Sequence, residues 1–288
     1  MKITELFKPG RTVFSFEVFP PKKDGSIDTI YKALEGLSGL SPDYISVTYG
    51  AGGSAAGCST REIVSLIKEQ YKTEATAHLT CVNCSKEDAD RFIAEFEEYG
   101  IENVLALRGD INPAYPPKTD FLHASDLIAY MKPRSNLCFS GGCYPEVHPE
   151  CDNMRDDILN LKKKVDAGAE HLVSQLFFDN SHFYDFVEKA RIAGITVPIE
   201  AGIMPCTNAN SIKRMVSMCG ASLPLKFTKL IARYGDNPEA MRDAGIAYAV
   251  DQIIDLVTNG VDGIHLYTMN NPYVAKRICE NVERVIRA

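Results

Sequence analysis

The chain has 288 residues, 45% of them hydrophobic and 24% charged, with a formal net charge of -7 and a pI near 5.5. An acidic chain of ordinary composition is not typical of proteins whose main partner is nucleic acid or an anionic membrane. The N-terminus has no signal-peptide core and no apolar run is long enough to span a membrane, so we expect a cytoplasmic protein.

Eight short β-rich segments alternate with helical patterns along nearly the whole chain. The predicted strands are residues 12–19, 44–49, 74–81, 103–109, 136–143, 171–178, 196–204 and 263–269. Apolar spacing predicts helices that include residues 27–37, 60–70, 86–99 and 156–167. Ser85, followed by Asp88, predicts an N-cap for the third of these helices. The strands are apolar without clean alternation, as parallel strands covered on both faces are. The pattern predicts an α/β fold, a single-domain (β/α)8 TIM barrel over residues 1–288, with an open doubly wound sheet as the alternative.

The cysteines and glycines form no strong metal or dinucleotide motif. Nine scattered cysteines in a chain without an export signal favour reduced thiols, and Cys81 with Cys84 is a single CxxC pair, which is weak support for zinc. The glycine-rich loop at residues 50–57 does not fit GxGxxG. A metal-dependent barrel hydrolase is kept as an alternative, although the chain lacks an HxH pair and no predicted strand carries a lysine for Schiff-base chemistry. We therefore expect no bound metal.

In a (β/α)8 barrel, functional groups lie at the C-terminal ends of the strands and in the loops that follow. Each candidate there also has a structural explanation: Glu17 in FSFEVFPPK could face solvent, His78 could be a core histidine, and Arg108 could pair locally. The barrel topology favours a site, because it would bring all of them to one mouth. The polar residues at these positions are Glu17, Thr48, Tyr49, His78, Arg108, Asp110, Tyr144, His148, Gln175, Thr207, Tyr267 and Asn270.

Nine short blocks occur in a characteristic order, and together they resemble the methylenetetrahydrofolate reductase family of the bacterial type. The blocks are FSFEVFPPK, SVTYGAGGS, AHLTC, ALRGD, YPEVHPE, LKKKVDAGA, SQLFFD, GIMP and HLYTMN. The resemblance implies an FAD-dependent barrel that reduces 5,10-methylenetetrahydrofolate to 5-methyltetrahydrofolate in one-carbon metabolism. NADH or NADPH would reduce the FAD, and the flavin N5 would then pass hydride to the folate. The family also implies a homo-oligomer.

The resemblance implies roles for individual residues. Glu17 is implied to be the general acid that protonates N10 and opens the five-membered ring of the folate, a role for which an apolar setting helps the carboxyl to hold its proton. Asp110 is implied to lie beside flavin and pterin, and the substrate-binding residues are Thr48, Asp110 and Gln175. The residues implied to bind FAD are Tyr49, Ala51, His78, Arg108, Gly109, Asp110, Ala124, Tyr144, His148, Asp157, Asn160, Lys163 and Lys164.

The departures from the family lie on the folate side. Ser211 stands where some relatives have glutamine, and Asn271 where they have arginine, which leaves the contact to the folate glutamate tail open. The electron donor is also open, because in some relatives an associated protein delivers the electrons. A folate- or flavin-binding subunit that needs such a partner is therefore a second hypothesis. The chain ends just after its last predicted helix, so we expect no C-terminal regulatory domain.

Overall fold

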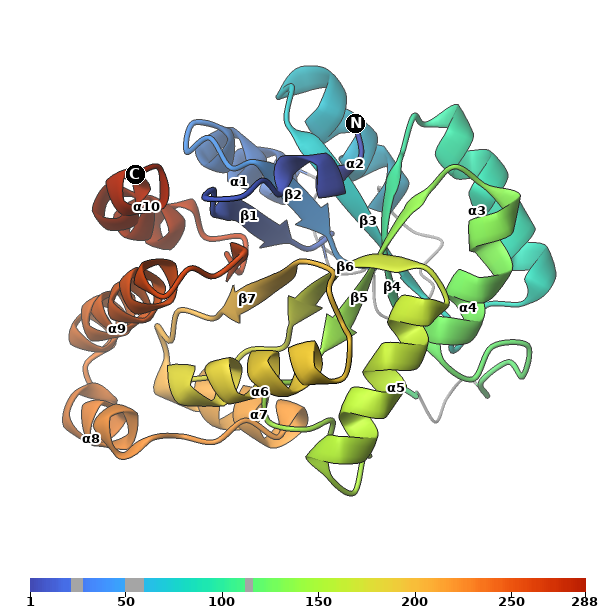
Figure 1. Ribbon diagram of the computed structural model, residues 1–288. Helices are drawn as coiled ribbons and strands as arrows, with labels where there is room; N and C mark the ends of the chain where they lie inside the picture. Colours follow the sequence, from blue (N-terminus) through green and yellow to red (C-terminus); the bar gives the residue numbers. More distant parts are fainter. Residues whose placement is uncertain (22–27, 50–59, 112–115) are drawn as a thin grey trace.

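The computed structural model describes residues 1–21, 28–49, 60–111 and 116–288, apart from the side chain of Lys213 (Figure 1). Eight parallel strands close into a barrel in chain order, which confirms the barrel and excludes the open doubly wound sheet. The strands are β1 (Val13–Val18), β2 (Tyr44–Val47), β3 (Glu74–Thr80), β4 (Asn103–Leu107), β5 (Cys138–Cys143), β6 (Ala169–Ser174), β7 (Ile199–Ile203) and β8 (Gly263–Tyr267).

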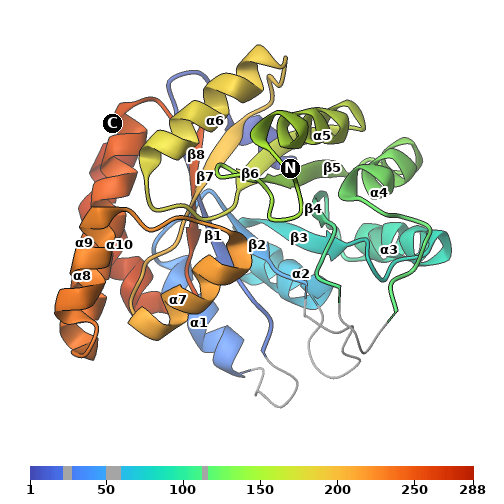
Figure 2. The same cartoon turned by 90° about the horizontal axis from the view of Figure 1, so that it is seen from below.

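Helices surround the barrel on the outside (Figures 1 and 2). They are α1 (Asp28–Ser38), α2 (Thr60–Gln70), α3 (Lys86–Glu98), α4 (Ala124–Met131), α5 (Met154–Asp166), α6 (Asn180–Ile192), α7 (Ala209–Cys219), α8 (Leu225–Tyr234), α9 (Pro238–Thr258) and α10 (Pro272–Ile286), with short 3-10 helices at η1 (Ile3–Leu6) and η2 (Lys132–Arg134). The segment between β7 and β8 holds the three helices α7, α8 and α9, where simple alternation has one. No helix in the described part of the chain is long and apolar enough to cross a membrane.

The N-cap predicted for the third helix is present. Ser85 accepts a hydrogen bond from the backbone N–H of Asp88, and the Asp88 carboxylate accepts one from the backbone N–H of Ser85, so the pair forms a capping box at the start of α3. Gly100 follows the helix with a φ of 63°, a left-handed conformation that glycine adopts without strain. The two signals explain why α3 begins and ends where it does.

The sixth predicted strand is displaced. Residues 171–178 were expected to be β-structure with Gln175 inside it, but β6 ends at Ser174. The N–H of Gln175 still bonds to Cys143 O at 2.7 Å, while the Gln175 side-chain oxygen accepts the next backbone N–H, that of Leu176, at 2.9 Å. That local bond takes the donor that a longer β6 would need for its ladder. Leu176 and Phe178 instead join a smaller core cluster that includes Phe227 of α8.

The interior of the barrel is unusually polar. The apolar residues Phe14, Phe16 and Val18 of β1 belong to the main core cluster with residues from several helices, whereas Ser15 and Glu17 alternate with them and make contacts across the barrel. The buried polar residues on the strands are Ser15, Ser46, Thr76, His78, Asn103, Ser140, His171, Ser174, Glu200 and His265. Interiors of such barrels are more often filled by branched aliphatic side chains, so this polar set needs partners of its own.

Candidate active site

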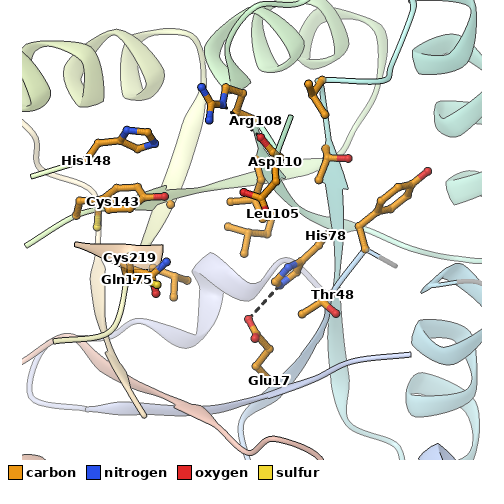
Figure 3. Close-up of a pocket in the computed structure, with 18 of the residues that line it drawn as sticks. Glu17, Thr48, His78, Leu105, Arg108, Asp110, Cys143, His148, Gln175 and Cys219 are labelled. Atoms are coloured by element: carbon orange, nitrogen blue, oxygen red, sulfur yellow. Dashed lines mark hydrogen bonds and ion pairs between the residues drawn. The ribbon is translucent and has the colours of Figure 1, made fainter. Parts of the chain in front are cut away.

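A cavity of about 930 Å³ opens at the C-terminal mouth of the barrel (Figure 3). It is lined by side chains from the ends of most strands, as the barrel topology predicts. Eleven residues predicted from the sequence line it: Glu17, Thr48, Tyr49, His78, Arg108, Gly109, Asp110, Tyr144, His148, Gln175 and Tyr267. The barrel therefore brings these groups together at one mouth. If each residue had only a structural role of its own, such clustering would not be expected.

Glu17 lies in the mouth rather than on the outer surface. The end of β8 holds the backbone around it: the Thr268 hydroxyl donates to Glu17 O at 2.6 Å, and the Asn270 side chain bonds to both the N–H and the C=O of Phe19, at 3.1 and 2.8 Å. The Glu17 side chain is only 20% exposed. Its Oε2 lies 3.7 Å from His78 Nε2, the contact drawn in Figure 3, and 3.6 Å from His265 Nε2. Two imidazoles therefore flank the carboxyl group.

His78 is a buried histidine that lines the cavity. Burial lowers its pKa from 6.5 to about 4, opposed by the charge of Glu17 and assisted by His265. The imidazole of His78 is therefore neutral at neutral pH. Its Nε2 has no hydrogen-bond partner among the described residues. A buried ring nitrogen without a partner at the edge of a cavity is a natural contact for a bound ligand.

Arg108 is a cationic residue that lines the cavity, and it forms an ion pair with Glu150. The guanidinium of Arg108 donates to both carboxylate oxygens of Glu150, to Oε1 at 2.8 Å, and this hydrogen bonding raises the pKa of Arg108. Both side chains keep some exposure, 27% and 59%. Gly109 follows with a φ of 84°, and a Cβ there would lie 2.8 Å from Thr80 Cβ, so the chain needs glycine between Arg108 and Asp110. The guanidinium can exchange Glu150 for another anion.

The loop after β5 arranges two aromatic groups over the start of α5. The rings of Tyr144 and His148 meet edge to face with centroids 4.5 Å apart, and Asp157 accepts the backbone N–H of His148 at 3.0 Å. Burial raises the pKa of Tyr144 to about 12 and lowers that of His148. Asp157 thus acts on the site through the loop, since it does not itself line the cavity.

The lysines of α5 divide between two positions. Lys164 donates to Gly142 O at 2.5 Å, and burial lowers its pKa. Its stem crosses β5 where a Cβ on Gly141 would lie 2.5 Å from Lys164 Cδ, so the glycine makes room for it. Lys163 is exposed and donates to Asn160 Oδ1 at 3.0 Å. Neither lysine lines the cavity, nor do Asn160 and the buried Ala124, while Ala51 lies outside the described residues.

Gln175 presents its amide to the cavity. Its oxygen is used by Leu176 N, whereas its amide nitrogen makes no hydrogen bond within the described chain. Asn271 caps α10 by accepting the N–H of Val274 at 3.2 Å, and Ser211 is exposed on α7. Asn271 therefore has a structural use at the start of this helix.

No motif in the sequence singled out Glu200 on β7 or His265 on β8, two of the ionisable residues inside the barrel. Both are fully buried, and His265 contacts Glu17 directly. The signal was available, because Glu200 in PIEAG is an acid inside an apolar strand, as Glu17 is in FSFEV.

The two thiols of the CxxC pair, Cys81 and Cys84, are buried. Burial raises the pKa of Cys81 to about 11 and that of Cys84 to about 12. Within residues 1–21, 28–49, 60–111 and 116–288, no group of three or more His, Cys, Asp or Glu side chains is placed to hold a metal ion.

The chain matches a family model described as methylenetetrahydrofolate reductase over residues 2–283. It is 35% identical over 273 residues to the 5,10-methylenetetrahydrofolate reductase of Pectobacterium carotovorum subsp. carotovorum and 34% identical to that of Escherichia coli K12, covering 95% of this chain and 91% of each relative. It is also 35% identical to methylenetetrahydrofolate reductase (NADH) 1 of Arabidopsis thaliana, of which it spans 48%.

A solved structure of an uncharacterized protein from Clostridium thermocellum, which binds two copies of 5-methyl-5,6,7,8-tetrahydrofolic acid, superposes with a TM-score of 0.67 at 14% identity and covers 96% of both chains. At that identity the likeness supports the barrel fold. The fold and the mouth define a (β/α)8-barrel protein with an acid between two imidazoles at its ligand cavity. The chain belongs to the methylenetetrahydrofolate reductase family, as the sequence blocks predicted.

Proposed function

We propose that this protein reduces 5,10-methylenetetrahydrofolate to 5-methyltetrahydrofolate with bound FAD, and that Glu17 supplies the proton. The observation that carries the proposal is the position of Glu17, a partly buried carboxyl at the mouth with neutral His78 at 3.7 Å. The family membership supports the reaction, because the bacterial relatives carry its name. The folate bound by the Clostridium thermocellum protein is compatible with a folate in this barrel mouth.

The residues of the cavity suit a flat ligand with anionic groups, as FAD is. His78 offers an unpaired ring nitrogen, Gln175 an unused amide nitrogen among the described residues, and Arg108 a guanidinium at the rim. Seven lining residues would hold FAD: Tyr49, His78, Arg108, Gly109, Asp110, Tyr144 and His148. The roles of Ala51, Ala124, Asp157, Asn160, Lys163 and Lys164 in FAD binding stay predictions. FAD, when bound and reduced, supplies hydride to the folate carbon.

The side chains of the protein carry out the proton and charge chemistry. Glu17 donates its proton to N10 of the folate, the bond between N10 and the methylene carbon breaks, and the remaining N5 iminium carbon becomes the hydride acceptor. The carboxylate of Asp110 stabilises that cation and disfavours negative charge on a neighbouring ring system. Thr48 and Gln175 border the place where the pterin would lie and orient it.

The electron donor is NADH, NADPH or an electron-delivering partner protein. The NADH in the names of the plant relatives is compatible with the first of these. The homo-oligomer and the cytoplasmic location inferred from the sequence stay predictions.

The test separates the two half-reactions. The protein is reconstituted with FAD, its flavin spectrum is recorded, and anaerobic stopped-flow follows flavin reduction by each donor and flavin reoxidation by methylenetetrahydrofolate. Glu17→Gln should leave flavin reduction near its normal rate and slow reoxidation by about 100-fold or more, because a positioned acid contributes at least that much. The control Glu170→Gln changes a carboxylate at the opposite end of the barrel, on β6, and should change neither rate. A protein without a flavin spectrum, or equal losses in both half-reactions, would refute the proposal.

A further inference from the structure

A chain of buried polar groups leads from Glu17 into the barrel. His265 Nε2 lies 3.6 Å from Glu17 Oε2, and His265 Nδ1 lies 2.7 Å from Ser15 Oγ. The Ser15 hydroxyl donates to Glu200 Oε1 at 3.0 Å. His265, Ser15 and Glu200 come from β8, β1 and β7 and are fully buried. The chemistry proposed above assigns no role to His265, Ser15 or Glu200.

Glu200 is a carboxylate whose charge is balanced by donors. The Tyr44 hydroxyl donates to Oε2, and His171 Nε2 lies 3.1 Å from the same oxygen, an ion-pair contact whose N–H is not aligned for a hydrogen bond. Burial opposes the charge of Glu200, but the contacts with His171, His265 and Tyr44 outweigh it and lower the pKa of Glu200. Gly263, the register partner of Glu200, leaves the space that its side chain occupies.

The negative charge of Glu200 determines where the protons lie on Ser15 and His265. A carboxylate only accepts hydrogen bonds, and Glu200 Oε1 is nearer to the Ser15 hydroxyl than the other acceptor in reach, Ile264 O, at 3.0 against 3.4 Å. The single hydroxyl proton of Ser15 therefore points to Glu200. The oxygen of Ser15 must then accept from His265 Nδ1, which therefore carries a proton. When the imidazole is neutral, that is its only proton. The other ring nitrogen, Nε2, is left with a lone pair directed toward Glu17 and toward the Ser46 hydroxyl at 3.4 Å. A lone pair there is complementary to a protonated Glu17 and repels a carboxylate.

We propose that Glu200 and Ser15 hold His265 as its Nδ1–H tautomer, so that His265 Nε2 accepts from Glu17 and favours the protonated carboxyl. The inference rests on the proposed function, since it explains how the acid is kept ready. His265 is a positioning residue, because it acts on Glu17 and not on the substrate. The 3.6 Å separation is longer than a hydrogen bond, and such contacts often tighten only when substrate binds.

The other groups that face Glu17 do not replace this contact. His78, on β3, is neutral, and its Nε2 has no hydrogen-bond partner among the described residues. Tyr267, on β8, donates its hydroxyl to Ser174 O at 2.8 Å. Tyr44, on β2, donates to Glu200. His265 is therefore the neighbour of Glu17 whose tautomer the described residues determine.

The tautomer can be measured without flavin or folate. In protein labelled with ¹⁵N-histidine, long-range proton–nitrogen spectra distinguish a protonated ring nitrogen from a bare one, and His265→Asn identifies the signals. We expect a proton on Nδ1 and none on Nε2. A proton on Nε2, in either the other tautomer or an imidazolium, would overturn the proposal.

Glu200→Gln provides the decisive variant. Tyr44 and His171 both face the Oε2 position, so the amide oxygen should take that place and the amide nitrogen should donate to Ser15. Ser15 would then donate to His265 Nδ1, and the proton of the imidazole should move to Nε2. Unchanged His265 signals in this variant would refute the proposal. If it fails to fold, Ser15→Ala should instead give a mixture of both tautomers, and a single tautomer with Nδ1 protonated would count against the inference.

A control and a kinetic measurement complete the test. Ser140→Ala removes a buried hydroxyl that bonds His171 Nδ1 at 3.0 Å, so it should leave the His265 signals unchanged. In Ser15→Ala, the pH at which folate-dependent flavin reoxidation declines should fall by about one unit, a slowing of about tenfold above that pH. Flavin reduction by the donor should keep its rate. If Glu17→Gln blocks reoxidation while Ser15→Ala leaves the pH profile in place, the proposed function stands and this inference fails.

Discussion

Acidification should destabilise the folded protein through His78, whose side chain is 5% exposed. Burial lowers the pKa of His78 from 6.5 to about 4. Between these values the unfolded chain binds a proton that the folded protein does not, so the free energy of unfolding decreases as the pH falls. The contribution of the neutral ring is complete above pH 6.5 and is lost as the pH approaches about 4. A difference of about 2.5 pH units, at 1.36 kcal/mol each, corresponds to about 3 kcal/mol.

The assay is urea unfolding without added FAD, at several pH values between about 7 and about 4. In His78→Gln, which has no group that titrates in this window, the loss of unfolding free energy over the range should be smaller than in the wild type by about 3 kcal/mol. His182→Asn, which replaces a histidine with 44% side-chain exposure, is the matched control and should follow the wild type. Equal losses in wild type and His78→Gln would show that the buried imidazole is not the source of the acid sensitivity.

Three further changes have defined outcomes. Gly263→Ala should lower the free energy of unfolding by about 1–3 kcal/mol in the urea assay, because the added Cβ would lie 2.6 Å from Glu200 Cγ. An unchanged urea midpoint would mean that the Glu200 side chain can move aside. Glu150→Gln should tighten FAD binding by up to about fivefold in a fluorescence titration, since the exposed carboxylate no longer competes for Arg108; weaker binding would argue against Arg108 as an FAD contact. Asp110→Asn should keep FAD bound while slowing the folate half-reaction and changing the flavin potential, and an apoprotein would contradict its assignment.

The sequence predicted the barrel and the outer part of the site well, because both depend on local patterns. Apolar runs and caps such as Ser85 mark the elements, and a closed parallel barrel then dictates that the residues after each strand share one mouth. The Glu17 prediction followed from this logic. The end of β6 was misplaced because Gln175 uses its own side chain to satisfy the next backbone N–H, which an apolar run does not reveal.

The buried contacts among Glu200, Ser15 and His265 could not be inferred from local sequence patterns. Which side chains meet inside a closed barrel depends on the register between strands, and Ser15 and Glu200, 185 positions apart, meet only because β1 and β7 both flank β8. Likewise, the position of the Lys164 stem depends on Gly141, since a Cβ there would lie 2.5 Å from Lys164 Cδ.

The bonds that hold the segment around Glu17 have a consequence for biosynthesis. Thr268 and Asn270, which bind Glu17 O and Phe19, are 251 positions later in the chain than their partners. During translation Glu17 leaves the ribosome early, but the residues that orient it are made near the end, after seven strands are already available to pair. A nascent or prematurely terminated chain that stops before β8 contains Glu17 but lacks Thr268 and Asn270, which orient its backbone, and it also lacks the strand that closes the barrel between β7 and β1. Chains released at that point would therefore lack catalytic competence.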